Sequence, residues 1–308
     1  MRSITKLLYV VLCIFFLPVA SFGGVLLQEN FDDTNFSSRG WYDSTGGAIS
    51  TAEHIPGSAA SFVCRFLPGG TDCSGGTPHR VLFTPTDTLY VSYWVKYSTN
   101  WQGQPPSFDH HEFLVMTNMN GAWDSLARTH LTAYIEQHHG TPVLQINDGQ
   151  NIDESRVGQN LANITENRAV AGCNGDGDAY AGLCWPVGSV HWNAKLWQAT
   201  GNYFSDSTGP TYKSDWHHIE AYFKLNSIAN SKGIADGILQ YWYDGKLIMD
   251  DRNVMLRTAI SSTMKFNQFI LAPYMGDGSP IDQTMWVDNL TIATARDVVT
   301  PAPPGNLK

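Results

Sequence analysis

The sequence predicts an all-β protein, an antiparallel jelly-roll sandwich of two sheets. Helical periodicity is nearly absent, and short runs of alternating polarity, rich in Val, Ile, Thr, Tyr, Phe and Trp, recur between clusters of Gly, Pro, Asn and Asp. We expect strands at residues 25–29, 59–66, 88–97, 109–117, 126–137, 143–147, 217–226, 237–243, 246–250, 265–272 and 285–293. Many short strands of this kind suit two packed, curved sheets.

A hairpin and a long loop region punctuate this pattern. Asp244-Gly245 readily adopts the positive φ angles of a tight type I′ turn, so we expect residues 237–243 and 246–250 to be neighbouring strands. Residues 150–215 are polar and irregular in pattern, and a loop region of that length is usually functional or held by its own contacts.

The two ends of the chain differ from the part between them. Arg2 and Lys6 precede an apolar run at residues 7–17 and then small residues, a pattern typical of a secretory signal peptide. We therefore predict a signal peptide at 1–23, one jelly-roll domain at 24–298 and a Pro-rich tail at 299–308. No later run reaches the roughly 20 apolar residues of a membrane helix. We expect a secreted, periplasmic or cell-surface protein.

Five cysteines are present, and Cys13 lies within the predicted signal peptide. The others form two close pairs, Cys64 with Cys73 and Cys173 with Cys184. Of the three possible connectivities the local one is favoured in an oxidising compartment, with free thiols as the alternative. Each bridge contributes about 2 to 3 kcal/mol by loop entropy.

The charge argues against nucleic acid as a partner. The formal net charge is −9, and the chain has no basic tract to neutralise phosphates. Asn174-Gly-Asp-Gly-Asp178 presents oxygens at alternate positions, as calcium loops do, but it lacks the Glu of an EF-hand. A turn tightened by Asp and Gly explains this segment better than a structural Ca²⁺ site, and we expect no cofactor.

Strand alternation places an unusual set of polar side chains on shared faces. In the 217–226 strand the face opposite the apolar one carries His218, Glu220, Tyr222, Lys224 and Asn226. The 126–137 strand repeats the arrangement with Arg128, His130, Thr132, Tyr134 and Glu136. Three further strands add Trp94 with Lys96, His110 with Glu112, and Gln240 with Trp242. If these faces adjoin, they form one cleft; the alternative is an ordinary amphipathic second face.

Each residue type in this set suits a cleft for polysaccharide or oligosaccharide. Trp94 and Trp242 can stack on sugar rings. A tyrosine with a histidine can move a proton. Lys224 and Arg128 can bind a uronate carboxylate and stabilise the charge that develops on it.

Several longer segments together resemble the concanavalin A-like lectin/glucanase superfamily, and within it the jelly-roll polysaccharide lyases. They are Leu27-Gln-Glu-Asn-Phe-Asp-Asp33, Trp216-His-His-Ile-Glu-Ala-Tyr-Phe-Lys-Leu-Asn226, Gly237-Ile-Leu-Gln-Tyr-Trp-Tyr-Asp-Gly-Lys246 and Met285-Trp-Val-Asp-Asn-Leu-Thr-Ile292. The resemblance covers most of residues 25–293. The Gln-Ile-His and Tyr-Phe-Lys-Ala-Gly motifs of the best-known alginate lyase family are missing, although Tyr222-Phe-Lys224 matches part of the second.

The resemblance implies β-elimination of a uronate-containing glycan. It implies Tyr222 or Tyr134 for proton transfer and His130 or His218 as partner. The groups implied for charge are Lys224, Arg128 and Asn226. The expected substrate-binding residues are Trp94, Lys96, His110, Glu112, Glu136, Glu220, Asn226, Gln240 and Trp242.

Two other functions stay open. A lectin-like module that binds glycan without turnover is the main alternative. A glycoside hydrolase needs two carboxylates about 5 to 10 Å apart, which Glu112, Glu136 and Glu220 offer, but the Glu-x-Asp-x-x-Glu motif of jelly-roll glucanases does not occur.

Overall fold

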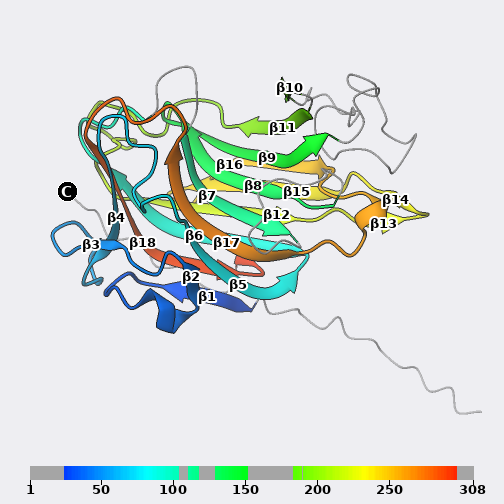
Figure 1. Cartoon of the computed structure of the whole chain (residues 1–308), viewed down its shortest axis with the longest axis horizontal. Coiled ribbons are helices and arrows are strands. Elements are labelled where there is room, and N and C mark those ends of the chain that lie inside the picture. Colours follow the sequence, from blue (N-terminus) through cyan, green and yellow to red (C-terminus); the bar gives the residue numbers. More distant parts are fainter. Residues whose placement is uncertain (1–23, 104–109, 118–128, 152–182, 189, 297–308) are drawn as a thin grey trace, which may run out of the picture.

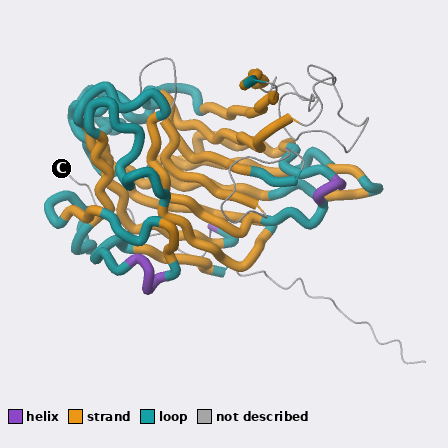
Figure 2. The backbone as a smooth tube through the Cα atoms, in the orientation of Figure 1, coloured by secondary structure: helices purple, strands orange, loops and turns teal. Residues whose placement is uncertain are grey.

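The computed structural model describes residues 24–103, 110–117, 129–151, 183–188 and 190–296, and in this part of the chain strands dominate (Figures 1 and 2). Two sheets of eight strands each lie one over the other. Sheet A runs β16 (Lys246–Val254), β15 (Gly237–Tyr243), β12 (His217–Lys224), β6 (Thr88–Tyr97), β18 (Gln283–Ala293), β4 (Ser61–Phe66) and β3 (Ala48–Ser50), with β1 (Val25–Glu29) also paired to β18.

Sheet B is likewise antiparallel. It runs β10 (Leu183–Val187), β11 (Val190–Gln198), β9 (Thr141–Asn151), β8 (Thr132–His138), β7 (His110–Thr117), β17 (Phe266–Met275), β5 (His79–Thr86) and β2 (Trp41–Asp43). The described part also contains a small ribbon of β13 (Ile228–Ala229) with β14 (Lys232–Gly233), and two 3-10 turns, η1 (Phe36–Arg39) and η3 (Ala259–Ser261). The predicted antiparallel two-sheet sandwich is confirmed.

The core lies between the two sheets and is built from alternate residues of their strands. Tyr93 of β6 packs on Phe113 of β7 with ring centroids 4.3 Å apart. Phe223 of β12 meets Phe266 of β17 at 6.0 Å. Because successive strand residues point to opposite faces, these contacts fix which residues face outward from each sheet.

The predicted hairpin is confirmed, whereas the long irregular region is partly wrong. Asp244 and Gly245 both have positive φ, 49° and 77°, between the paired strands β15 and β16. Residues 150–215, expected to be irregular, contain β10 and β11, which extend sheet B beyond β9. The pairing with β9 supplies the backbone hydrogen bonds that local sequence pattern does not reveal.

The predicted signal peptide and Pro-rich tail lie outside the described residues, and the extent of the domain stays a prediction. Within the described ranges, no helix is both long enough and apolar enough to cross a membrane.

Asp288 on β18 ties a loop across the outside of sheet A. Its Oδ2 accepts a hydrogen bond from the Ile55 N–H at 3.0 Å, and its Oδ1 accepts from the Ser58 hydroxyl at 3.1 Å and the Asn289 N–H at 2.8 Å. Burial raises the pKa of this carboxyl to about 6, although the three donors oppose the shift. Folding therefore favours its protonated form.

This shift predicts a pH-dependent contribution to stability. The native state holds the Asp288 proton more tightly than the unfolded state, so its stabilising effect is present in acid and is lost as pH rises from about 4 through about 6. The Asp288→Asn variant cannot titrate there. Urea unfolding between pH 4 and 7 should show wild-type stability falling relative to the variant, and parallel curves would contradict the shifted pKa.

Candidate functional site

The predicted polar faces belong to different sheets. On sheet A three of them adjoin. His218 of β12 lies opposite Trp94 of β6, Tyr222 lies opposite Gln240 of β15, and Glu220 lies opposite Trp242 of β15. The faces of β7 and β8 lie in sheet B.

The residues that precede Tyr222 and Tyr134 in their strands show which way the two tyrosines face. Ala221 of β12 and Ala133 of β8 both contribute to the core between the sheets. Tyr222 and Tyr134 therefore face outward on opposite sides of the sandwich. The prediction of one cleft formed by all these strands is wrong.

On the outward face of sheet A, Glu220 forms an ion pair with Arg296. Glu220 accepts hydrogen bonds from the Tyr90 hydroxyl at 2.8 Å and from Arg296 at 2.8 and 3.1 Å. The Arg296 guanidinium also lies 4.7 Å from the Trp242 ring centroid. Glu220 and Tyr90 are fully buried. Glu220 thus anchors the segment after β18. Its side chain is not exposed to bind a sugar, the role that the sequence predicted.

Other predicted groups on this side also have protein partners. The Lys96 ammonium pairs with Glu53 at 2.6 Å, and Gln240 donates to Asp250 at 2.8 Å. The Asn226 side-chain oxygen accepts from the backbone N–H groups of Leu256 and Arg257. The His218 ring packs against Trp94 at 4.9 Å, and burial lowers the pKa of His218. Tyr222 and Lys224 are half-buried at this face.

Glu112 is directed into the molecule rather than toward a substrate. It is 2% exposed and accepts a hydrogen bond from the Tyr97 hydroxyl of the opposite sheet. Burial, and then the charge of Glu112, raise the pKa of Tyr97 far above its usual value. The pairing of β17 with β7 is irregular between Leu271 and Tyr274, beside this position. Strict alternation therefore does not predict the direction of Glu112.

A pocket of about 440 Å³ opens on the outward face of sheet B. We call it the Tyr134 pocket. Its lining residues are Asp72, Ser74, Gly76, Pro78, Leu114, Tyr134, Ala272, Pro273 and Tyr274. Tyr134 lies opposite Leu114, which lies opposite Ile270, so neighbouring strands supply the floor. The volume is in the range of small-molecule sites.

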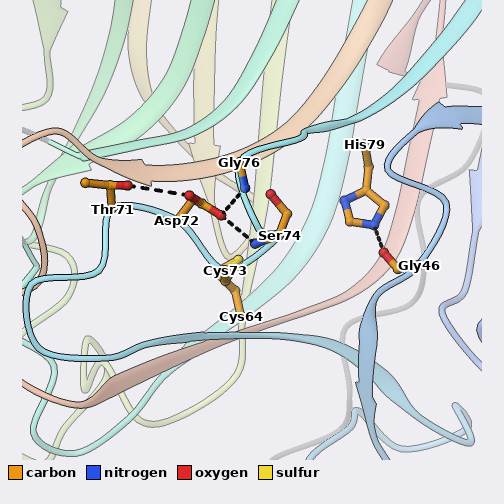
Figure 3. The surroundings of a disulfide bond; sticks show 8 residues. All are labelled: Gly46, Cys64, Thr71, Asp72, Cys73, Ser74, Gly76 and His79. Carbon is orange, nitrogen blue, oxygen red and sulfur yellow. Dashed lines mark hydrogen bonds between the residues drawn. A yellow bond between two sulfur atoms is a disulfide. The ribbon is translucent and has the colours of Figure 1, made fainter.

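One wall of this pocket is a loop held by a disulfide (Figure 3). Cys73 is bonded to Cys64 of β4, which confirms the first predicted bridge. The Asp72 carboxylate accepts hydrogen bonds from the N–H groups of Ser74 and Gly76 at 2.9 and 2.8 Å. Asp72 also forms a backbone bridge with Tyr274. These contacts join the loop to the end of β17.

The environment of Tyr134 favours the protonated form of its hydroxyl. Burial, and then the charge of Glu136, raise the pKa of Tyr134 above its usual value. The phenol is therefore protonated at neutral pH. Glu136 is 1% exposed and lies on the same strand, with its Oε1 3.5 Å from His138 Nε2. His130 is fully buried just before β8.

Several predicted groups lie outside the described residues. They are Arg128, the side chains of His110 and Cys184, Cys173 and the Asn174–Asp178 segment, so the second bridge and the calcium loop stay predictions. Among the described residues, no group of three or more His, Cys, Asp and Glu could hold a metal ion.

Sequence-based reasoning identified Tyr134 but missed the rest of the pocket. Tyr274 and Asp72 lie on an irregular strand end and a loop, where neither period-2 alternation nor a motif marks them. The one available signal was the Cys64 and Cys73 pair, which predicted a constrained loop at this place.

Solved structures share the fold. An alginate lyase from Aplysia kurodai has a TM-score of 0.58 at 12% identity, with 88% of this chain and 100% of that chain covered. A variant of alginate lyase Aly36B in complex with alginate trisaccharide has a TM-score of 0.51 at 15% identity, with coverage of 88% and 99%. Alginate lyase vAL-1 from Chlorella virus has a TM-score of 0.50 at 12% identity, with coverage of 81% and 92%.

No protein-family model and no curated protein matches the sequence. At these identities the likeness establishes the fold, and it bears out the predicted resemblance to jelly-roll polysaccharide lyases.

The disulfide gives a prediction about the pocket wall. Replacing both Cys64 and Cys73 by Ala should lower the free energy of unfolding by about 2 to 3 kcal/mol, because the unfolded chain regains the entropy of the closed loop. Chemical denaturation measures this change. If the doubly substituted protein unfolds at the same denaturant concentration as wild type, the bridge does not constrain this segment.

Proposed function

We propose that this protein is a polysaccharide lyase that cleaves a uronate-containing glycan by β-elimination at the Tyr134 pocket. The observation that carries the proposal is a buried, protonated tyrosine at the base of an open pocket, on a fold shared with three alginate lyases. The apolar run at residues 7–17 supports export, which fits a polymeric substrate outside the cell.

The reaction needs a proton removed from C5 of the uronate and a proton delivered to the departing O4. The C4–O4 bond breaks as the C4–C5 double bond forms. Tyr134 is our candidate for the proton delivered to O4, because its hydroxyl is protonated at neutral pH and the residue lines the pocket. The structure places His218 on the other sheet, so His130 is the remaining predicted proton acceptor on the side of Tyr134.

The uronate carboxylate needs a positive partner while charge develops on it. Asp72 is the charged residue among the described pocket-lining residues. We therefore retain Arg128, whose position precedes β8, as the proposed cation. Lys224 belongs to β12 of sheet A and Asn226 to the segment after it, so neither is a candidate for this role at the Tyr134 pocket.

Two tyrosine variants test the site directly. Tyr134→Phe should lower kcat by roughly 100-fold or more, since it removes only the transferable proton. Tyr222→Phe is the matched control on the outward face of sheet A and should keep wild-type activity. A uronan panel, followed by ultraviolet absorbance of the unsaturated product, measures both. An active Tyr134→Phe, or an inactive Tyr222→Phe of unchanged stability, contradicts the assignment.

Non-catalytic glycan binding is the second candidate, and the composition of the pocket favours it. No lysine, arginine or histidine occurs among the described lining residues, whereas two tyrosines do. Tyr274 is 43% exposed. An exposed aromatic ring beside a pocket is a suitable platform for a sugar ring.

Retention on immobilised glycans separates the two candidates. Tyr274→Ala should weaken retention roughly tenfold under either function, because it removes the stacking surface. A lyase loses retention with time as unsaturated product appears, whereas a binding module holds the glycan without product. Unchanged retention of Tyr274→Ala would exclude this ring from the site.

A further inference from the structure

A second pocket, of about 450 Å³, lies at the end of the sandwich where three loops meet. We call it the Lys213 pocket. It is lined by Thr99, Asn100, Trp101, Gln102, Gln137, His139, Gly140, Asn202, Phe204, Asp206 and Lys213. None of these residues lines the Tyr134 pocket. The loops follow β6 and β11 and join β8 to β9.

The pocket contains a buried ammonium whose carboxylate partner is exposed. The Lys213 side chain is 6% exposed, and its Nζ donates to the Trp101 carbonyl and to the Asp206 carboxylate. The Asp206 side chain is 87% exposed. An ammonium carries three donors, so one remains beyond the two bonds made to described residues.

The backbone holds this ammonium in place. The Lys213 N–H donates to the Ser205 carbonyl at 3.0 Å, and its carbonyl accepts from the Tyr97 N–H at 2.9 Å. Trp101 and Phe204 pack on the Tyr97 ring at 4.7 and 5.2 Å. The charge is therefore built into a rigid wall rather than carried on a mobile surface side chain.

The opposite rim is equally constrained and polar. Gly140 has a φ of 86°, and an added Cβ would lie 2.6 Å from the Asn202 amide, so glycine is required there. The side-chain oxygen of Gln137 accepts a hydrogen bond from the Gly140 N–H. The NH₂ group of the Gln137 side chain has no partner among the described residues. Amide groups of this kind suit the hydroxyls of a sugar.

We propose that the Lys213 pocket is a second sugar-binding site that recognises the carboxylate of an acidic sugar. In the free protein the Lys213 ammonium is paired with the Asp206 carboxylate, and the ligand carboxylate displaces Asp206 from this pair. The ligand carboxylate takes the place of the Asp206 carboxylate at the buried ammonium, so the ammonium is not left unpaired, and the displaced Asp206 side chain remains in water. The ligand gains a charge-assisted hydrogen bond to an ammonium that is already desolvated.

Calorimetric titration with sodium glucuronate tests the site, with glucose as the neutral sugar. Asp206→Asn removes the competing carboxylate and should tighten glucuronate binding roughly two- to fivefold. Lys213→Met should weaken it roughly tenfold or more. Asp33→Asn, which loses an exposed carboxylate paired with Arg39 elsewhere, is the matched control and should bind as wild type.

Three outcomes overturn the proposal. They are an affinity of Asp206→Asn equal to that of Asp33→Asn, glucose binding as tightly as glucuronate, and full affinity in a folded Lys213→Met. If Lys213→Met does not fold, the comparison of the two aspartate variants decides. A monosaccharide has no glycosidic bond to cleave, and repeating the titrations in the Tyr274→Ala background separates binding at the Lys213 pocket from binding at the Tyr134 pocket.

Discussion

The packing of the two sheets against each other is the interaction on which the rest of this molecule depends. A regular strand turns alternate residues inward, so the contacts of Tyr93 with Phe113 and of Phe223 with Phe266 determine the outward residues along the regular parts of four strands. The irregular pairing beside Glu112 is an exception. The position of Tyr134 in a pocket and the burial of Ala133 are two consequences of the same register.

Polar groups inside the sandwich are held in specific arrangements. Glu112 accepts a hydrogen bond from Tyr97, and the His217 ring lies 2.9 Å from Asp244 and 2.6 Å from the Tyr243 hydroxyl. A buried polar group without a partner is costly, so such contacts oppose a shift in register. They explain why ionisable residues in these strands are not by themselves evidence of a substrate site.

The two outward faces differ in structure. On sheet A, the buried Glu220 pairs with the partly exposed Arg296 and accepts a hydrogen bond from the buried Tyr90, and the Ile55 N–H donates to Asp288. On sheet B, the disulfide-held loop and Tyr274 border the pocket in which the buried Tyr134 lies. The same strand architecture thus carries an ion pair and a bonded loop on one outward face and a pocket on the other.

The sequence by itself determined the all-β class, the Asp244-Gly245 hairpin, the Cys64 to Cys73 bridge and which side chains share a face within β6, β12 and β15. These depend on local periodicity, turn chemistry and short chain separation. Only the tertiary structure decided that Tyr134 and Tyr222 face away from each other, that Glu112 turns inward, and that Tyr274 joins Tyr134. The physical reason is that strand order, a bulge and loop placement arise from contacts between residues far apart in the chain, which no local pattern records.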